Sequence, residues 1–261
     1  MTYLRNCVLL MVVITTSAVQ ASARHGALFV PSDDVSGEVS SVLARALDAD
    51  KLALIVLGAN WCHDSRALAA RLNEEPLQTL VDRGFVSALI DVGYYERGQS
   101  VMQRFGEQIY YATPTVLVVD PRTETIVGHP DRHQWGAAAS ISMADSLNYF
   151  REISEARKTA LAGVPEHDEA SRAGLDALSQ FESIQAVRIA RGYEVVGPLL
   201  AVLDQSGEKP EAFDQLWREL AALRNGISED IFAHRQSLLR GESPRYSLSA
   251  LAEKYPRLSW E

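Results

Sequence analysis

The stretch from Leu52 to Leu72 constrains the fold more than any other part of the chain. Its beginning, Leu52–Gly58, is an unbroken apolar run, which is typical of a strand buried on both faces of a sheet. A short Gly-Ala-Asn link follows. From Cys62 onward apolar residues recur at helical spacing until Pro76, which cannot continue a helix. The pattern predicts a strand, a tight turn and a helix with Cys62 in its first turn.

Within this pattern, Cys62 is the residue whose position indicates a chemical role. The start of a helix presents unsatisfied backbone N–H groups and the positive end of the helix dipole, which favour a thiolate. A protonated His63 would add positive charge, whereas Asp64 has the opposite effect. Ser65, one turn along, can donate a hydrogen bond to the sulfur. We therefore expect a modestly activated nucleophile.

Three motifs, taken in order, carry a family resemblance. They are WCHDS at 61–65, ATPT at 112–115 before the apolar run 116–119, and VG at 127–128. In this order and spacing they resemble the active-site helix, the cis-proline loop and the substrate-groove glycine of the thioredoxin superfamily. The resemblance covers roughly residues 27–156 and does not extend to the C-terminal part of the chain.

The resemblance implies an α/β fold, a thioredoxin-like sandwich in which helices flank a central mixed sheet. The order of hydrophobic patterns agrees with it. Strands are expected at 27–30, 52–58, 85–92, 115–119 and 124–128, and helices near 36–47, 62–72, 77–81, 95–105 and 135–160. Long amphipathic patterns at 168–191, 193–203 and 210–239 predict an all-α C-terminal extension that packs on the first domain as a cap or an interaction surface. The expected domains are 24–160 and 161–261.

The resemblance also implies roles for individual residues. Cys62 would be the catalytic nucleophile, tuned by Ser65 and His63. The substrate groove would be shaped by Trp61, Thr113, Pro114 and Gly128. A cis Pro114 would leave the Thr113 backbone free to pair with an extended substrate, as a strand does.

Two departures from the family pattern restrict the expected chemistry. Ser65 stands where the family has its second cysteine, and Val56 stands where many thioredoxins bury an acid that aids proton transfer. A lone thiolate can form a mixed disulfide, but another thiol must resolve it. The site thus favours isomerase-like exchange, deglutathionylation or mixed-disulfide capture over net reduction. Peroxide chemistry is a weaker alternative, because Asn60 and Trp61 occupy the places where that branch carries threonine or proline.

An alternative from another class is a redox-inactive binding or scaffold protein. It would use the substrate groove and the helical C-terminal region to hold a partner. The missing second cysteine and the missing buried acid both fit this alternative.

The N-terminus has the pattern of a secretory signal peptide over residues 1–23. Arg5 precedes an apolar run at 8–14, and Ala21-Ser22-Ala23 fits a cleavage site. We expect cleavage after Ala23 and export, with the bacterial periplasm as the destination. The apolar run is short for a bilayer span, which makes a retained anchor the lesser alternative. Cleavage would remove Cys7 and leave Cys62 without an internal disulfide partner.

Charge and composition narrow the expected partners. The formal net charge of −9 argues against binding to nucleic acid or to anionic membranes, and no stable membrane insertion is expected after signal cleavage. The expected partners are cysteine-containing client proteins or low-molecular-weight thiols, together with an external reductant or resolving thiol. No motif indicates a cofactor. His129, Asp131 and His133 could bind a metal with Cys62 or His63, but a solvated polar loop is the favoured interpretation, so no metal site is predicted.

Overall fold

The computed structural model describes residues 28–127, 130–160 and 169–261. The predicted signal peptide, Gly128 and both predicted domain boundaries at 23/24 and 160/161 lie outside these residues or at their edges. No helix within the described ranges is both long enough and apolar enough to span a membrane.

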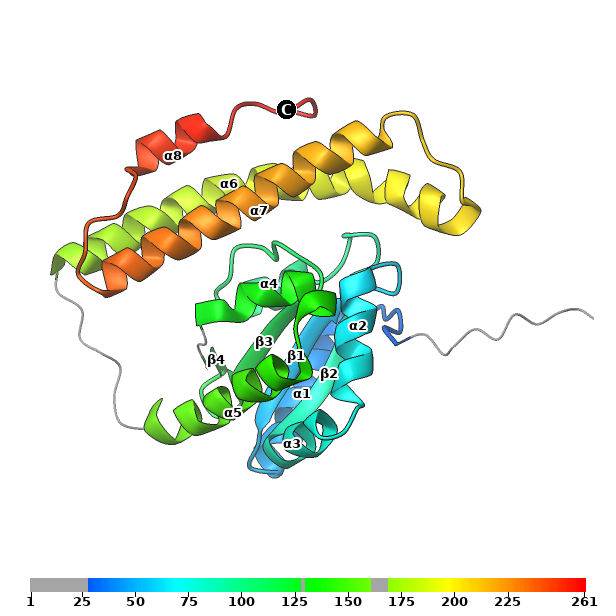
Figure 1. The fold of residues 1–261 in the computed structure, drawn as a ribbon, viewed down its shortest axis with the longest axis vertical. Coiled ribbons are helices and arrows are strands. Elements are labelled where there is room, and N and C mark those ends of the chain that lie inside the picture. Colours follow the sequence, from blue (N-terminus) through cyan, green and yellow to red (C-terminus); the bar gives the residue numbers. More distant parts are fainter. Residues whose placement is uncertain (1–27, 128–129, 161–168) are drawn as a thin grey trace, which may run out of the picture.

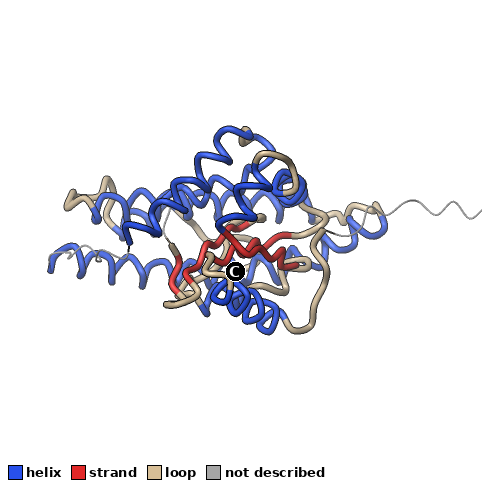
Figure 2. The backbone as a smooth tube through the Cα atoms, turned by 90° about the horizontal axis from the view of Figure 1, so that it is seen from below, coloured by secondary structure: helices blue, strands red, loops and turns tan. Residues whose placement is uncertain are grey.

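A four-stranded mixed sheet forms the centre of the α/β part, with the strand order β2-β1-β3-β4 (Figures 1 and 2). β1 (Leu52–Gly58) runs parallel to β2 (Phe85–Asp91) and antiparallel to β3 (Thr115–Asp120). β4 (Thr125–Ile126) pairs with β3 as a hairpin. In this register the C-terminal ends of β1 and β2 meet the beginning of β3 at one edge of the sheet. That edge positions the candidate site.

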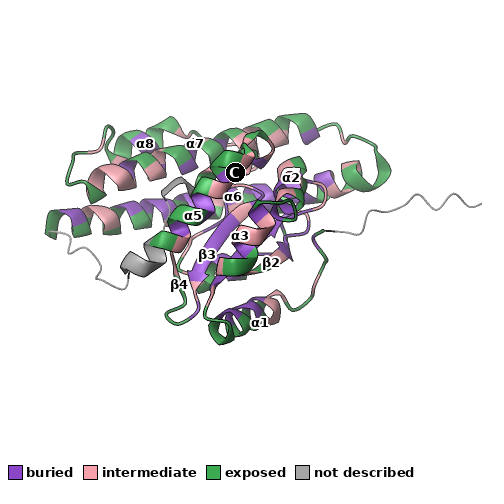
Figure 3. Ribbon diagram, turned by 60° about the horizontal axis from the view of Figure 1, so that its bottom comes forward, coloured by how far each residue is buried: buried purple, intermediate pink, exposed green. Residues whose placement is uncertain are grey.

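Two layers of helices cover the sheet, because alternate β1 residues enter different cores. Leu52, Leu54 and Val56 join the core built with α2 (His63–Leu72), α3 (Leu77–Gly84) and α5 (Met143–Ala160). Ala53, Ile55 and Leu57 join the core built with α1 (Val35–Asp48) and α4 (Gln99–Arg104). Every residue of β1 is buried, as Figure 3 shows by the colour of the central strands. The apolar run thus becomes the two-sided strand that its sequence predicts.

The C-terminal part is helical throughout its described residues. α6 (Glu169–Ser206) and α7 (Phe213–Leu239) lie side by side as a long hairpin over the α/β part, and α8 (Leu248–Lys254) lies on the outer side (Figure 1). The hairpin contributes to the same continuous core as α1 and α4. The predicted thioredoxin-like sandwich with an all-α C-terminal extension is therefore confirmed as a fold class.

Three expected elements differ from the structure. The helix expected at 95–105 is confined to α4, because Tyr95 (φ 78°) and Gly98 (φ 89°) take a left-handed backbone conformation that a right-handed helix cannot include. The helix expected at 135–160 is divided into a 3₁₀ segment, η1 (Pro130–Ser140), and α5. The Ser142 hydroxyl accepts a hydrogen bond from the Asp145 N–H and so begins α5 anew.

The third difference is the first strand, which is reduced to an isolated parallel bridge between Val30 and Ile90. In addition, α6 continues through Pro198, a residue type that normally ends a helix. Proline leaves the carbonyl of the residue four positions earlier without its helical donor. Buried residues on both sides of Pro198, among them Tyr193 and Leu200, pack the helix onto the rest of the protein and offset that loss.

Candidate functional site

Cys62 lies at the N-cap of α2, directly after the turn that leaves β1. Its carbonyl oxygen accepts the N–H of Arg66 at 3.1 Å, so the helix begins at this residue. The side chain is 9% exposed, and its Sγ donates a hydrogen bond to the Thr113 carbonyl oxygen at 3.1 Å. The sulfur therefore lies between the helix start and the segment 109–114 that leads into β3.

The segment around Pro114 has the conformation that the resemblance implied. The Thr113–Pro114 peptide bond is cis, and both residues are buried. The Thr115 hydroxyl donates to the Ala112 carbonyl oxygen at 2.7 Å, which closes the turn on the other side of the proline. Cys62, Thr113 and Pro114 thus come together, although fifty-one positions separate the bonded cysteine and threonine.

Ser65 and His63 occupy different environments. Ser65 is completely buried, and its Oγ has no hydrogen-bond partner among the described residues. A Cβ atom at Gly58 would lie 2.8 Å from that Oγ, so Ser65 faces the end of β1. The expected hydrogen bond from Ser65 to the Cys62 sulfur is therefore not formed. His63 is exposed and lies at the rim of the cavity described below.

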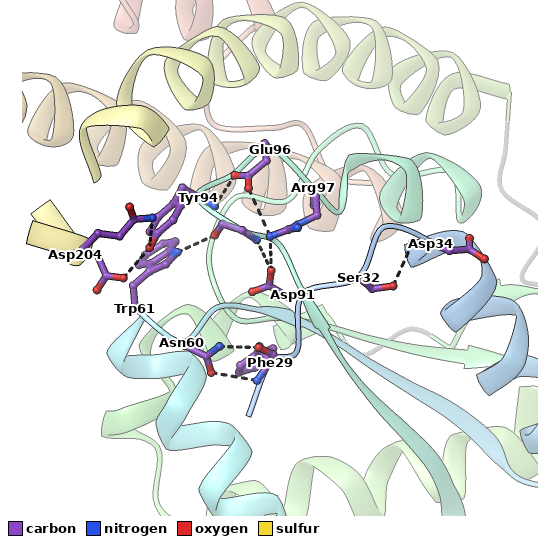
Figure 4. Close-up of polar contacts among 12 residues, drawn as sticks. Phe29, Ser32, Asp34, Asn60, Trp61, Asp91, Tyr94, Glu96, Arg97 and Asp204 are labelled. Carbon is purple, nitrogen blue, oxygen red and sulfur yellow. Dashed lines mark hydrogen bonds and ion pairs between the residues drawn. The ribbon is translucent and has the colours of Figure 1, made fainter. Parts of the chain in front are cut away.

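Trp61 connects the turn to the segment 92–98 that links β2 to α4. Its Nε1 donates to the Gly93 carbonyl oxygen at 2.7 Å (Figure 4). Its ring meets Tyr95 edge to face at 5.2 Å and Trp217 of α7 at 6.4 Å. The half-buried indole thus contacts both the α/β part and the helical hairpin.

Two polar contacts hold the loops beside Cys62. The Asn60 side chain accepts the Phe29 N–H at 3.1 Å and donates to the Phe29 carbonyl oxygen at 2.6 Å, as a paired strand would (Figure 4). Asp91, at the end of β2, accepts from the Gly93 N–H at 3.1 Å and from Arg97 at 2.7 Å. Burial raises the pKa of the Asp91 carboxyl, and the Arg97 guanidinium opposes this increase.

Arg224 of α7 also lies at this site, although no motif in the sequence points to it. Its Nη1 donates to the Tyr95 hydroxyl at 2.8 Å, and the Tyr193 hydroxyl is close enough to affect the pKa of Arg224. Burial alone would lower the pKa of Arg224, but these two hydroxyls more than offset that effect and raise it. The pKa of Tyr95 is raised by burial and lowered by Arg224, and both Cys62 and Thr113 are close enough to affect it. The Arg224 guanidinium is therefore bonded to Tyr95, which in turn lies close to Cys62 and Thr113.

These residues enclose a cavity of about 700 Å³ between the α/β part and the helical hairpin. One wall comes from the start of α2 and the segment 109–114, and the other comes from α6 and α7. The residues that matter for its chemistry are Cys62, Thr113, Pro114, Trp217 and Arg224. A volume of this size is typical of a small-molecule or short-peptide site.

Of the remaining candidate residues, His133 lies at the cavity and the others are not fully described. Gly128 and His129 are outside the described residues, and the side chain of Asp131 is not described either. His133 lies at the cavity, where its Nδ1 is 3.1 Å from the Ser228 hydroxyl of α7. Among the described residues, no three side chains of the metal-ligating types gather into a cluster.

Comparisons with known proteins yield one similar structure. No family model matches the chain, and no curated protein matches it. The crystal structure of a disulphide isomerase from Xylella fastidiosa Temecula1 is similar to it, with 27% sequence identity and a TM-score of 0.44. The match covers 48% of this chain and 97% of the other chain.

Proposed function

We propose that this protein carries out thiol-disulfide exchange through a single cysteine, Cys62. One observation carries the proposal: the Cys62 sulfur lies 3.1 Å from the Thr113 carbonyl oxygen, at the wall of a cavity that a substrate can occupy. The segment 109–114 offers its backbone beside the sulfur, and Cys62 stands at the start of α2, where unsatisfied backbone N–H groups favour a thiolate. A substrate disulfide in the cavity would therefore meet both a nucleophile and hydrogen-bonding groups.

The reaction consists of two exchanges and involves no net oxidation or reduction. The Cys62 thiol loses its proton to solvent, and the thiolate attacks one sulfur of a disulfide RS–SR. The Cys62–SR bond forms while the RS–SR bond breaks, and one RS⁻ leaves. A second thiolate R′S⁻ then attacks the mixed disulfide, which releases RS–SR′ and regenerates the Cys62 thiolate. Because Ser65 cannot supply that second thiolate, it must come from the client, a small thiol or another protein.

The proposal is tested by measuring mixed-disulfide formation at Cys62. The full-length protein is incubated with glutathione disulfide, and the peptide containing Cys62 is examined by mass spectrometry. We expect a glutathione adduct that excess thiol removes, and catalysis of exchange between two small disulfides. Cys62→Ser should abolish both, whereas Cys7→Ser should abolish neither. A Cys62 that forms no adduct in the folded protein, yet forms one after denaturation, would refute the proposal.

A redox-inactive binding protein is the second candidate function. It is favoured by the low exposure of Cys62 and by the helical hairpin, which covers one side of the cavity. In that case the cavity would bind its ligand without a covalent step. Equal ligand binding by the wild type and by Cys62→Ser, together with no exchange activity, would support this candidate over the first.

Export to the periplasm through the signal peptide at 1–23 belongs to the same proposal. An oxidising compartment would supply disulfide substrates. The test is to determine the N-terminal sequence of the protein recovered from cells, which should begin at Arg24. Recovery of the full-length chain from the cytosol would contradict it.

A further inference from the structure

We propose that Arg224 binds a carboxylate group of the substrate, and that Cys62 therefore acts on small thiols and disulfides that carry a carboxylate, such as short cysteine-containing peptides. This inference rests on the proposed exchange function and narrows its substrate class. It concerns the wall of the cavity that α7 supplies, to which no motif in the sequence points.

Arg224 is positively charged and has no carboxylate partner among the described residues. In the part of the chain that the structure describes, its polar neighbours are the uncharged hydroxyls of Tyr95 and Tyr193. Its Nε is buried and has no hydrogen-bond partner there. A guanidinium offers five N–H donors, and two hydroxyls use only part of them. A cation that is largely removed from water and lacks a counter-ion is stabilised when an anion binds.

The guanidinium of Arg224 shares one cavity with the Cys62 sulfur. Arg224 and Cys62 both line the cavity of about 700 Å³, one on the hairpin side and one on the α/β side. Tyr95 connects the two sides. Its hydroxyl accepts a hydrogen bond from Arg224 at 2.8 Å, and Cys62 and Thr113 are close enough to affect the pKa of that hydroxyl. A molecule whose sulfur reaches Cys62 can therefore place a carboxylate at Arg224 within the same cavity.

Two aromatic rings hold the Arg224 guanidinium in place. It lies over the rings of Tyr95 and Trp217, 5.7 and 5.5 Å from their centroids. Such cation–π contacts and the fork of N–H groups suit arginine for planar recognition of a carboxylate. Acidic residues also line the cavity, among them Glu107 and Glu229, but neither is an ion-pair partner of Arg224.

The size of the cavity supports a small substrate. The Tyr193 hydroxyl donates to the Tyr110 carbonyl oxygen at 2.7 Å, so α6 rests on the segment that an extended polypeptide would need to pair with. With the hairpin in this position, the cavity has room for a few residues of peptide. A long unfolded client would have to displace the hairpin.

The test compares two alkylating reagents that share a mechanism and differ in charge. Both iodoacetate and iodoacetamide form a carbon–sulfur bond with the Cys62 thiolate and release iodide, but only iodoacetate carries a carboxylate. Rates are measured on the Cys62 peptide of the full-length protein, and their ratio is divided by the same ratio for the urea-unfolded protein. We expect a normalised preference for iodoacetate of about tenfold, as for a charge-assisted hydrogen bond.

Substitutions of Arg224 then test whether this residue causes the preference for iodoacetate. Arg224→Gln should remove the preference, and Arg224→Lys should retain part of it because the charge remains. Arg218→Gln, at an exposed position of the same helix, serves as the matched control and should leave the preference unchanged. A preference that is unchanged in Arg224→Gln would overturn the proposal. So would an equal decrease in both rates, because Arg224 would then act on the thiol rather than on the carboxylate.

A second comparison separates this proposal from the exchange function. Glutathione disulfide carries carboxylates, whereas bis(2-hydroxyethyl) disulfide carries none. If exchange occurs equally fast with both, and equally in Arg224→Gln, the exchange function stands and the carboxylate site is refuted. If neither disulfide reacts while the iodoacetate preference still depends on Arg224, the carboxylate site stands and the exchange function is refuted.

Discussion

The Tyr193 hydroxyl donates a hydrogen bond of 2.7 Å to the carbonyl oxygen of Tyr110. This contact joins the middle of α6 to the segment that leads into Thr113 and Pro114. The neighbouring Tyr111 hydroxyl binds Glu182 of the same helix at 2.8 Å. The helical extension is therefore attached to the segment that forms one side of the thiol cavity. We expect the stability of this attachment to control access to Cys62.

Glu182→Gln should weaken this attachment. The buried Glu182 carboxylate accepts from Tyr111 at one oxygen and from Arg235 at the other, each at 2.8 Å. The amide provides only one acceptor and directs an N–H group at a donor, so we expect a loss of about 2–3 kcal/mol in the free energy of unfolding. Tyr111→Phe loses one hydrogen bond and should cost about 1 kcal/mol. Urea unfolding followed by tryptophan fluorescence measures both, and equal stability of the two variants would contradict this ranking.

Gly197→Ala should separate α6 from the segment 92–98. A Cβ atom at this position would lie 2.2 Å from the Tyr94 carbonyl oxygen, which belongs to the backbone and cannot rotate away. The clash should cost about 1–3 kcal/mol, more than the gain of about 1 kcal/mol in helix propensity. We expect a lower urea midpoint and faster alkylation of Cys62 by iodoacetamide.

Gly174→Ala is the matched control on the same helix. Its Cβ would meet the Cδ2 atom of Leu238 at 2.7 Å, and that atom ends a flexible side chain. The gain of about 1 kcal/mol in helix propensity should offset the cost of moving Leu238, so stability should not decrease by more than about 0.5 kcal/mol, and Cys62 should react at the wild-type rate. A slower Cys62 in Gly197→Ala than in Gly174→Ala would show that the hairpin does not limit access.

His234 should make the helical hairpin sensitive to acid. Burial lowers the pKa of this imidazole in the folded protein below the ordinary value of about 6.5. This imidazole therefore binds a proton more readily in the unfolded chain than in the folded protein. The stability that comes from keeping it neutral is complete above about pH 6.5 and is lost as the pH falls through the folded-state pKa. The free energy of unfolding should decrease between pH 7.5 and pH 5, and the decrease should be smaller in His234→Gln. Equal decreases in the two proteins would rule out this role.

Ser65→Cys should convert the site from exchange to reduction. Ser65 lies one turn into α2, at the position where a resolving thiol belongs, and it is completely buried. Ser65 faces the end of β1, so the new cysteine side chain has to turn toward Cys62. Its thiolate would then attack the mixed disulfide at Cys62, release the client thiol and leave an internal disulfide. The lifetime of a preformed glutathione adduct should fall by at least about tenfold in the absence of added thiol.

Ser65→Ala provides the control for this variant. It removes a buried hydroxyl that has no partner among the described residues, so stability should be unchanged or higher by about 1 kcal/mol. The adduct should persist as long as in the wild type. Release of the adduct by the alanine variant would show that the resolving thiol comes from elsewhere.

Local sequence patterns predict much of the fold because the physical causes are local. The run at Leu52–Gly58 has no polar side chain and becomes β1 at those bounds, and Cys62 begins α2 as the apolar spacing indicates. The beginning of α4 is not predictable in this way. Tyr95 takes a left-handed conformation that its residue type disfavours, and contacts with Trp61, Tyr193 and Arg224 maintain it.

The candidate site could be predicted only on the α/β side. Cys62, Thr113 and Pro114 belong to recognisable motifs, and the structure brings them together. Arg224 bonds with Tyr95 across 129 positions of sequence, and nothing in its own segment distinguishes it from the other arginines of a polar helix face. The continuation of α6 through Pro198 also could not be predicted from the local sequence. Proline normally ends a helix, and here tertiary packing keeps the helix intact.

The left-handed backbone at Tyr95 has a consequence for how this position can evolve. A bulky residue in that region costs about 1–3 kcal/mol relative to an unstrained conformation, and glycine would relieve most of it. Glycine, however, would remove the hydroxyl that anchors Arg224 and the ring that stacks on Tyr193 at 4.3 Å. At this single position the backbone conformation favours glycine, whereas the contacts beside the cavity require the tyrosine side chain. Variants that lose the tyrosine ring should have a less strained backbone in the segment 92–98. They should also discriminate less between substrates with and without a carboxylate.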